Sequence, residues 1–263
     1  MNFKRIISIV LVCLMATMSM TAKVRKSKAP VKITCIGASI TEGAMTANPA
    51  TDSYPAQLGR MLGERYVVSN FGVGGCSMLR KGDCPYWEKE AYQQALASEP
   101  DIVFIDLGGN DSKAVNRVHM DEFVKDACEM IASFQNLPTK PRIIVLTPIV
   151  SFVEDSNGIY DEVICSKVSP KTIEAADRMR VEVLDMHSVL NRRPDLMPDC
   201  IHPNTEGSGL TARKMCDYLK AYPQKPSEGM TIDGMANNPF ITHIFTADPS
   251  AHVWEDGRLY VYA

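Results

Sequence analysis

The sequence lacks the features that mark several large classes of protein. It has no excess of positive charge, because 28 Lys and Arg residues against 31 Asp and Glu residues give a net charge of -3, and this leaves no basic field for nucleic acid. No apolar run reaches the ~20 residues of a membrane-spanning helix. Neither Cys-x-x-Cys nor His-Glu-x-x-His occurs, and Ser77 stands where a dinucleotide fingerprint needs its third glycine. We therefore expect a chain that works without metal or cofactor.

Residues 1–22 are expected to be a secretory signal peptide and not part of the fold. A short basic region precedes the apolar stretch 6–20, and the small residues Thr21 and Ala22 follow it, which is the pattern of an exported precursor. We expect cleavage after Ala22 and a periplasmic or extracellular protein. A bulky residue precedes Cys13, which argues against a lipid anchor at that cysteine.

Seven cysteines follow the predicted signal peptide, and export permits disulfides. Because seven is an odd number, at least one thiol must stay free or pair outside the chain. Cys76 and Cys84 are close in sequence, and they form the pair to test first for a disulfide.

Strand-like and helix-like segments alternate through the middle of the chain. Apolar runs predict strands at residues 31–36, 66–71, 101–107, 142–146 and 181–184. Apolar residues at helical spacing predict helices at residues 54–62, 86–96, 121–134, 172–180 and 205–218. Strands this apolar, separated by helices, predict an α/β fold, a three-layer α/β/α sandwich with a central parallel sheet over residues 30–222. In such sheets functional groups gather beyond the carboxyl ends of the strands.

The end of the chain departs from this alternation. Residues 223–237 are predicted to be a linker because they open with a stretch containing Pro and Gly. Residues 238–263 hold short β-like runs and end in an apolar strand pattern. A β segment of 26 residues cannot bury a core of its own. It either docks on the first domain or, as we favour, begins a further domain of a longer protein.

Ser39 lies at the end of the first predicted strand, between Gly37 and Gly43. Glycines there permit a tight turn and the close approach of a substrate, which suits a nucleophile. A serine hydroxyl becomes a good nucleophile when a base takes its proton. The alternative is that Ser39 caps a helix, which is a common role of serine.

His202 is the candidate base, because Asp199 stands three residues before it in a loop that precedes a predicted helix. This spacing lets the carboxylate hold one ring nitrogen while the other nitrogen faces the serine. A surface turn is the alternative for this segment, and His187 is a rival base.

Two segments could donate hydrogen bonds to a developing oxyanion. Asn110 follows the third predicted strand, and its side-chain amide is one candidate donor. Gly75 follows the second predicted strand, and its backbone N–H is another. For each residue the alternative is that it forms part of a tight turn and has no catalytic role. Together with a nucleophile, a base and an orienting acid, they indicate acyl transfer.

This set of segments resembles the SGNH hydrolases, also called GDSL esterases, across residues 31–210. The matching blocks follow in order at residues 37–41, 70–75, 108–111 and 199–203. The resemblance makes Ser39 the nucleophile, His202 the base and Asp199 its orienting acid. It places the oxyanion hole at Gly75, Asn110 and the Ser39 N–H, and it implies the three-layer fold already expected.

The tail is similar to the start of a family 43 glycoside hydrolase, a five-bladed propeller. Residues 238–240 and 247–250 carry the similarity, which implies that Asp248 is a glycosidase base. An ordinary Asp-Pro turn is the alternative. Glycoside hydrolysis needs two carboxylates, and no second one is identifiable, so the fragment is not expected to act alone.

The SGNH resemblance implies hydrolysis of acyl esters or thioesters, often of acetyl groups on sugars. Ala38 departs from the family pattern, since many members have Asp there, but Asp199 remains to orient the histidine. We therefore expect a secreted serine esterase, a carboxylic-ester hydrolase that removes acetyl or other short acyl groups from carbohydrate. A fused glycoside hydrolase would point to plant polysaccharide. The alternatives are a lipid or thioester acyl hydrolase of the same fold and a non-catalytic carbohydrate-binding module.

Overall fold

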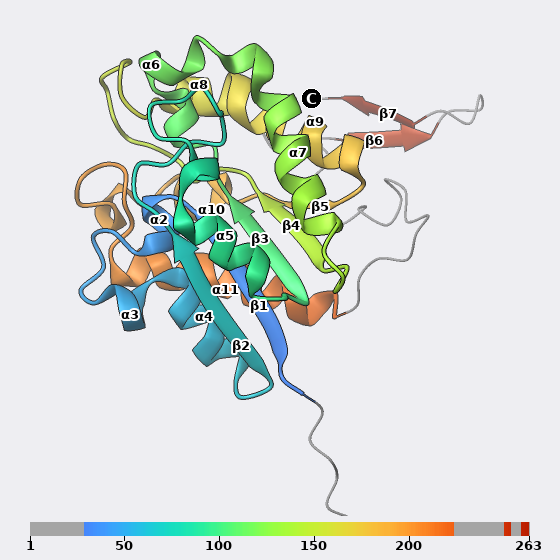
Figure 1. The fold of residues 1–263 in the computed structure, drawn as a ribbon. Coiled ribbons are helices and arrows are strands. Elements are labelled where there is room, and N and C mark those ends of the chain that lie inside the picture. Colours follow the sequence, from blue (N-terminus) through green and yellow to red (C-terminus); the bar gives the residue numbers. More distant parts are fainter. Residues whose placement is uncertain (1–28, 224–249, 254–258, 263) are drawn as a thin grey trace, which may run out of the picture.

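A five-stranded sheet in the order β2-β1-β3-β4-β5 runs through the protein (Figure 1). The structure is a computed structural model that describes residues 29–223, 250–253 and 259–262. The strands of this sheet are β1 (Val31–Gly37), β2 (Tyr66–Gly72), β3 (Ile102–Asp106), β4 (Arg142–Leu146) and β5 (Glu182–Leu184). Every pairing between them is parallel, as the apolar strand pattern predicts.

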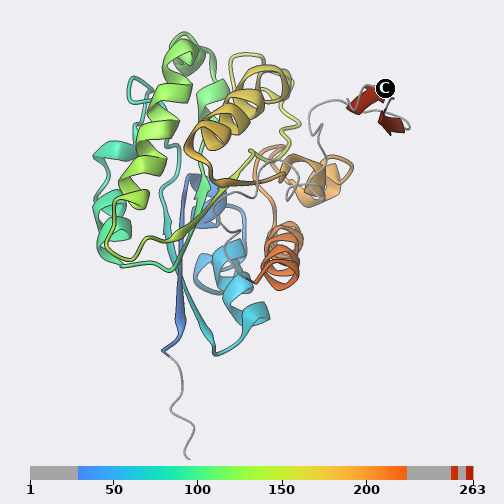
Figure 2. The ribbon, with the colours of Figure 1, turned by 90° about the vertical axis from the view of Figure 1, so that its right-hand side faces the viewer.

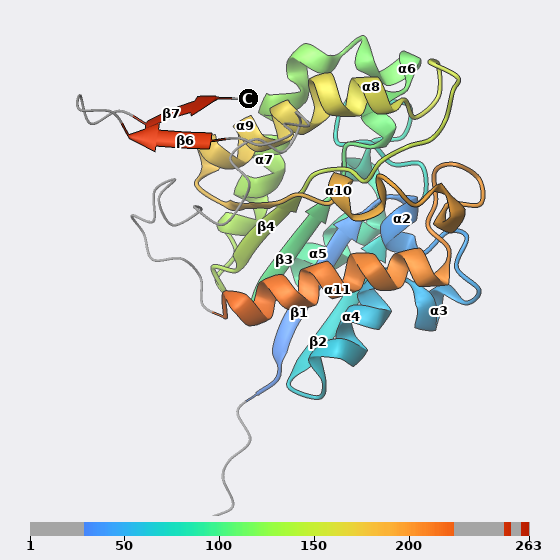
Figure 3. The ribbon, with the colours of Figure 1, turned by 180° about the vertical axis from the view of Figure 1, so that it is seen from behind.

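Helices cover both faces of the sheet. One face is covered by α4 (Tyr54–Leu62) and α11 (Thr205–Ala221), and the other by α5 (Glu90–Ala97), α7 (Phe123–Gln135) and α9 (Ser169–Met179) (Figures 2 and 3). Side chains alternate along each strand, so Val103 and Ile105 of β3 join one buried cluster while Phe104 joins the other. The prediction of a three-layer α/β/α sandwich is confirmed.

Short helical segments fill the connections, mostly near the carboxyl ends of the strands. They are α2 (Ser39–Glu42), α3 (Pro49–Asp52), η1 (Tyr86–Glu88), η2 (Asn110–Ser112), α6 (Ala114–Arg117), η3 (Met120–Glu122), α8 (Asp161–Val163), the π-helical η4 (Ile164–Val168), α10 (His187–Leu190) and η5 (Pro194–Leu196).

The strand order creates a switch point between β1 and β3. From β1 the chain crosses to β2 on one side, and later returns to pair β3 on the other side of β1. Crossovers that leave in opposite directions open a crevice at the carboxyl ends of these two strands. Ser39 follows β1 and Asn110 follows β3, so both lie at this crevice.

The remaining strands are β6 (Ser250–Val253) and β7 (Leu259–Tyr262), which pair antiparallel and form the predicted C-terminal β fragment. The predicted signal peptide 1–22, the linker beyond residue 223, and Asp248 with residues 238–240 lie outside the described residues. In the part of the chain that is described, no helix is both long and apolar enough to cross a membrane.

Candidate functional site

Ser39 is the first residue of α2, the one-turn helix that follows β1 directly. Ala38 occupies the N-cap position, and no side chain caps this helix. The Ser39 hydroxyl instead lies 2.7 Å from Nε2 of His202. The helix-capping alternative is therefore wrong, and the hydroxyl faces an imidazole nitrogen that can accept its proton.

Asp199 holds His202 through the ring nitrogen that faces away from Ser39. Its Oδ2 lies 2.6 Å from His202 Nδ1, and its Oδ1 accepts the backbone N–H groups of Ile201 and His202 at 3.0 and 2.7 Å. Partial burial raises the pKa of Asp199, but the hydrogen bonds from His202 and Ile201 outweigh it, so the pKa stands below its usual value. A charged carboxylate at this position favours the proton on Nδ1 and leaves Nε2 as an acceptor.

The loop that carries Asp199 and His202 is anchored to the loop after β4. Cys200 has a φ of 67°, in the left-handed region that a non-glycine residue seldom adopts. Its carbonyl accepts the N–H of Phe152 at 2.8 Å. The acid and the imidazole are thereby positioned by a segment that also contributes Val150 and Ser151 to the wall of a pocket.

Asn110 begins η2 and is 4% exposed. Its carbonyl accepts a hydrogen bond from the Asn116 side chain at 2.8 Å. The adjacent Asp111 accepts the N–H groups of Met78 and Leu79 at 2.9 and 2.7 Å, which joins η2 to the segment after β2. Within the described residues the Asn110 side-chain amide has no hydrogen-bond partner. Although the residue is largely buried, its amide is not among the fully buried unpartnered atoms, so it can donate a hydrogen bond to a ligand.

The turn after β2 lies against α2. A Cβ atom built on Gly74 would come within 3.9 Å of the Ser39 Cβ, so the two segments are neighbours. Gly75 has a φ of 79°, and a Cβ there would meet nothing within 4 Å. The Gly75 N–H also has no partner in the described part of the chain. As the first helical residue, Ser39 likewise has no intrahelical acceptor for its N–H.

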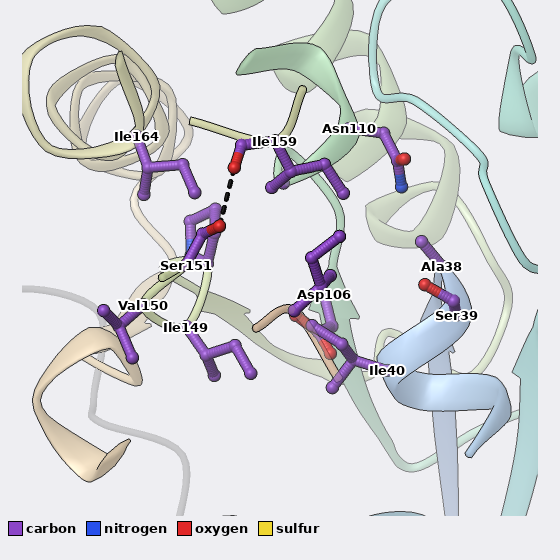
Figure 4. Close-up of a pocket in the computed structure, with 13 residues that line it drawn as sticks. Ala38, Ser39, Ile40, Asp106, Asn110, Ile149, Val150, Ser151, Ile159 and Ile164 are labelled. Atoms are coloured by element: carbon purple, nitrogen blue, oxygen red, sulfur yellow. Dashed lines mark hydrogen bonds between the residues drawn. The ribbon is translucent and has the colours of Figure 1, made fainter. Parts of the chain in front are cut away.

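A pocket opens beside Ser39, and the Asn110 amide points into it (Figure 4). Its apolar lining consists of Ala38, Ile40, Gly109, Pro148, Ile149, Val150, Ile159, Ile164 and Ile201. Its polar lining consists of Ser39, Asp106, Asn110 and Ser151. The nucleophile candidate and one donor candidate thus share a pocket whose walls suit a small apolar group.

Asp106 ends β3 beneath α2 and is not among the residues predicted from the sequence. Its Oδ2 accepts a hydrogen bond from the Thr41 hydroxyl at 2.9 Å, and Thr41 Oγ1 lies 2.9 Å from the Tyr54 hydroxyl. Burial raises the pKa of Asp106 to about 6, against these hydrogen bonds from Thr41 and Tyr54. A carboxylate at the end of an otherwise apolar strand is the signal that could have found it.

The rival base His187 does not contact Ser39. Its Nε2 lies 3.0 Å from Asp161 Oδ1 and 3.3 Å from Cys165 Sγ, in a cluster of its own. The predicted thiol pair is also close in space, with the sulfur atoms of Cys76 and Cys84 3.5 Å apart.

Comparison with known proteins places the chain among ester hydrolases. A model of the GDSL-like Lipase/Acylhydrolase family matches residues 35–210. An acetylxylan esterase of Xylanibacter ruminicola is 37% identical over 209 residues, a match that covers 73% of this chain and 42% of that protein. A GDSL esterase/lipase of Arabidopsis thaliana is 25% identical over 205 residues, which covers 64% of this chain and 80% of that protein. This chain therefore spans less than half the length of the bacterial relative.

Solved structures share the fold. A carbohydrate acetylesterase from Sinorhizobium meliloti superimposes with a TM-score of 0.58 at 18% identity, covering 73% of this chain and 99% of that one. A two-domain esterase active on acetylated mannans gives a TM-score of 0.58 at 20% identity, covering 76% of this chain and 52% of that one. Identities this low show the fold alone.

Proposed function

Because the chain belongs to the GDSL-like Lipase/Acylhydrolase family, we propose that it is an exported serine esterase that removes acetyl or other short acyl groups from carbohydrate. Membership of the family confirms the coarser prediction of a carboxylic-ester hydrolase. One observation carries the proposed chemistry, the hydrogen-bonded series from Ser39 Oγ through His202 to Asp199 at 2.7 and 2.6 Å. A fused glycoside hydrolase beginning near residue 238, with Asp248 as its base, stays a prediction.

In the proposed mechanism Ser39 Oγ attacks the ester carbonyl while His202 Nε2 takes the hydroxyl proton. Asp199 stabilises the imidazolium that forms. The negative charge that develops on the carbonyl oxygen is met by the Asn110 amide and by the N–H groups of Gly75 and Ser39, which act as the oxyanion hole. As the bond between the carbonyl carbon and the sugar oxygen breaks, His202 gives its proton to that oxygen, and the sugar leaves with a free hydroxyl group.

The second half of the reaction releases the acyl group. Water takes the place of the sugar, His202 removes a proton from it, and the hydroxide attacks the acyl–Ser39 ester. Collapse of this second tetrahedral state frees a carboxylic acid and returns the proton to Ser39. Apart from water, the groups that act in both halves are side chains and backbone N–H groups of this chain.

The substrate class is inferred from the relatives and from the pocket. The bacterial relative is named an acetylxylan esterase, and one structure of the same fold is described as active on acetylated mannans. The apolar walls beside Ser39 suit a short acyl group. We therefore infer acetylated polysaccharide of plant type as the substrate. Export is inferred from the signal-like residues 1–22 alone.

The proposal is tested by measuring acetate release from acetylated xylan and acetylated mannan, together with hydrolysis of 4-nitrophenyl esters of increasing chain length. We expect the purified protein to release acetate and to prefer acetyl over long acyl chains. Ser39→Ala should lower kcat on the order of 10⁶-fold, as loss of the nucleophile does in other serine hydrolases. Ser133→Ala is the matched control, because Ser133 lies in α7 and its hydroxyl donates to the Met130 carbonyl, its one side-chain partner among the described residues.

Three results would change the conclusion. Preference for long acyl chains would support the lipid or thioester hydrolase. Binding of xylan without turnover of any ester would support the carbohydrate-binding module. Full activity in Ser39→Ala, with the control also active, would remove Ser39 from the mechanism.

A further inference from the structure

Three side chains with metal-binding atoms converge next to Ser151, a residue that lines the pocket. Asp161 begins α8, Cys165 lies in the π-helical segment η4, and His187 begins α10. His187 Nε2 lies 3.0 Å from Asp161 Oδ1 and 3.3 Å from Cys165 Sγ, and Cys165 Sγ lies 3.8 Å from Asp161 Oδ2. Single turns of π-helix occur frequently at functional sites.

This cluster is not a second nucleophile, base and acid. In the Ser39 site the hydroxyl meets Nε2 of the histidine and the carboxylate meets Nδ1. Here the thiol and the carboxylate both meet the same nitrogen, Nε2 of His187. A single N–H cannot relay a proton between two groups on its own side of the ring. A nitrogen, a sulfur and a carboxylate oxygen within 4.8 Å of one another are instead a set of ligand atoms that a cation can bind.

We propose that Asp161, Cys165 and His187 bind a zinc ion. Thiolate sulfur, imidazole nitrogen and carboxylate oxygen are the three ligand types that zinc takes in proteins, and the usual bond lengths place tetrahedral ligand atoms about 3.3–3.6 Å apart. His187 Nε2 lies 3.0 Å from Asp161 Oδ1 and 3.3 Å from Cys165 Sγ, and one ligand atom from each of the three residues lies within 4.8 Å of the others, so small side-chain movements bring the set to that range. The thiolate and the carboxylate together balance the charge of the ion. Three protein ligands leave a fourth position for water.

The cluster is accessible to solvent, and one of its proposed ligands is oriented by a further hydrogen bond. The Asp161 and His187 side chains are 31% and 19% exposed, so an ion can reach them. Asp161 Oδ1 also accepts the Ser151 N–H at 3.0 Å, an outer contact of the kind that orients a metal-binding carboxylate.

The proposed zinc site is adjacent to the Ser39 pocket. Ser151, Ile159 and Ile164 line the pocket (Figure 4), and each is a contact or a near neighbour in sequence of a proposed ligand. Asp161, Cys165 and His187 are not themselves among the residues that line the pocket, so we assign the ion no role at the reacting atoms.

Metal binding is tested directly on the full chain after removal of metal with EDTA. Titration with zinc chloride by calorimetry should show one ion per chain. Titration with Co²⁺ should produce thiolate-to-cobalt charge-transfer absorption in the near ultraviolet. Cys165→Ser should abolish that absorption and weaken zinc binding by more than the roughly 10–100-fold that loss of an outer-shell partner costs, and His187→Gln should weaken zinc binding in the same way.

Cys84→Ser is the control, because Cys84 lies beside Cys76 and is not part of the proposed site, and it should bind both metals as the wild type does. Circular dichroism and hydrolysis of 4-nitrophenyl acetate by the metal-free protein establish that each variant is folded. If Cys165→Ser does not fold, His187→Gln provides the same test. Absence of zinc binding, or binding that survives in folded Cys165→Ser and His187→Gln, overturns the proposal.

Discussion

The Asn70 side-chain amide donates a hydrogen bond to the Thr41 main-chain carbonyl over 2.7 Å, and so joins the end of β2 to the helix that carries Ser39. On its other side Thr41 is bonded through its hydroxyl to Asp106 of β3. The helix α2 is therefore held from both strands that flank β1. This fixes the Ser39 backbone although the helix is only one turn long.

Gly72 lets β2 pass close to α2, and replacing it should misplace Ser39. A Cβ built on Gly72 would stand 2.2 Å from the Glu42 nitrogen and 2.6 Å from the Thr41 carbonyl carbon, and backbone atoms cannot move aside as a side chain can. We expect Gly72→Ala to lower kcat/KM for 4-nitrophenyl acetate about 100-fold, which is the cost of misplacing reacting groups by about 1 Å.

Gly59→Ala is the matched control for Gly72→Ala. Gly59 lies inside α4, and a Cβ there would make an ordinary 3.5 Å contact with Val68. Alanine in a helix interior is favoured over glycine by roughly 0.5–1 kcal/mol, so this variant should unfold at a slightly higher temperature with unchanged kcat/KM. Wild-type kcat/KM in Gly72→Ala would show that α2 tolerates the displacement.

Asn110→Ala should lower kcat on the order of 10²–10³-fold, as removal of one oxyanion donor does in other enzymes. KM should change little, because the donor acts on charge that appears in the transition state. The melting temperature should also change little, since the amide has no partner among the described residues. Asn136→Ala, at the C-terminal end of α7, controls for loss of an asparagine. A rise in KM at constant kcat would instead give Asn110 a role in ground-state binding.

Asp199→Asn should lower kcat by about 10⁴-fold, the effect of the same change in a serine protease. The new amide would donate to Nδ1 of His202 and leave the proton on Nε2, where it blocks acceptance from Ser39. Asp195→Asn is the control, because Asp195 is an exposed carboxylate nearby that is paired with Arg193. If Asp199→Asn keeps more than a tenth of the activity, the histidine does not depend on Asp199 for its orientation.

The pH dependence of stability should reveal Asp106. Burial raises its pKa from 3.8 to about 6, so between these values the native state holds a proton that the unfolded state has lost. The group therefore makes the free energy of unfolding fall as pH rises from about 4 to 6, by at most about 1.4 kcal/mol per pH unit. Urea unfolding at several pH values should show Asp106→Asn gaining stability relative to wild type over this range. A pH-independent difference would contradict the raised pKa.

Oxidation should join Cys76 and Cys84. Their sulfur atoms are 3.5 Å apart, and the Ser77 N–H donates to the Cys84 carbonyl at 2.9 Å, so the backbone already brings them together. Burial raises the pKa of Cys76 to about 12, so we expect Cys84 to attack glutathione disulfide first. Cys76 then displaces the bound glutathione as a thiol and closes the disulfide.

Thiol titration should show the loss of two free thiols per chain. Urea unfolding should show a rise of about 2–4 kcal/mol in the free energy of unfolding. Cys128→Ser should behave as wild type, and Cys84→Ser should lose the effect. A disulfide mapped to any other pair would contradict the prediction.

The individual helices and strands could be predicted from the sequence, because the periodicity that marks each of them lies within its own residues. The segments 54–62 and 142–146 agree with α4 and β4 at both ends. By contrast, α9 begins at Ser169, before the predicted start at residue 172, because it continues directly from the π-helical segment η4. The predicted helix 86–96 is divided into η1 and α5. The order of the strands depends on pairing between distant segments and carries no local signal.

The site residues also fall into those that a local sequence pattern marks and those that only the folded structure brings together. Ser39, Asn110 and the Asp199–His202 segment could be selected because each follows a strand or lies in a loop with a recognisable residue pattern. The hydrogen bond between Thr41 and Asp106 could not be predicted, because it joins positions 65 apart in the chain. The cluster of Asp161, Cys165 and His187 also escapes sequence motifs, because the histidine comes from a separate segment.

The hydrogen bond between Ser39 and His202 joins residues 163 positions apart in the chain. A contact of such long range closes a large loop, and the entropy cost of that closure makes it slow to form, so we expect it to follow the local helices and strands. During synthesis, a chain whose residue 202 has not yet left the ribosome therefore contains the serine without its imidazole, whatever secondary structure it has formed. During refolding, recovery of hydrolysis should follow the recovery of helical circular dichroism, and the enzyme reports the completion of its own folding.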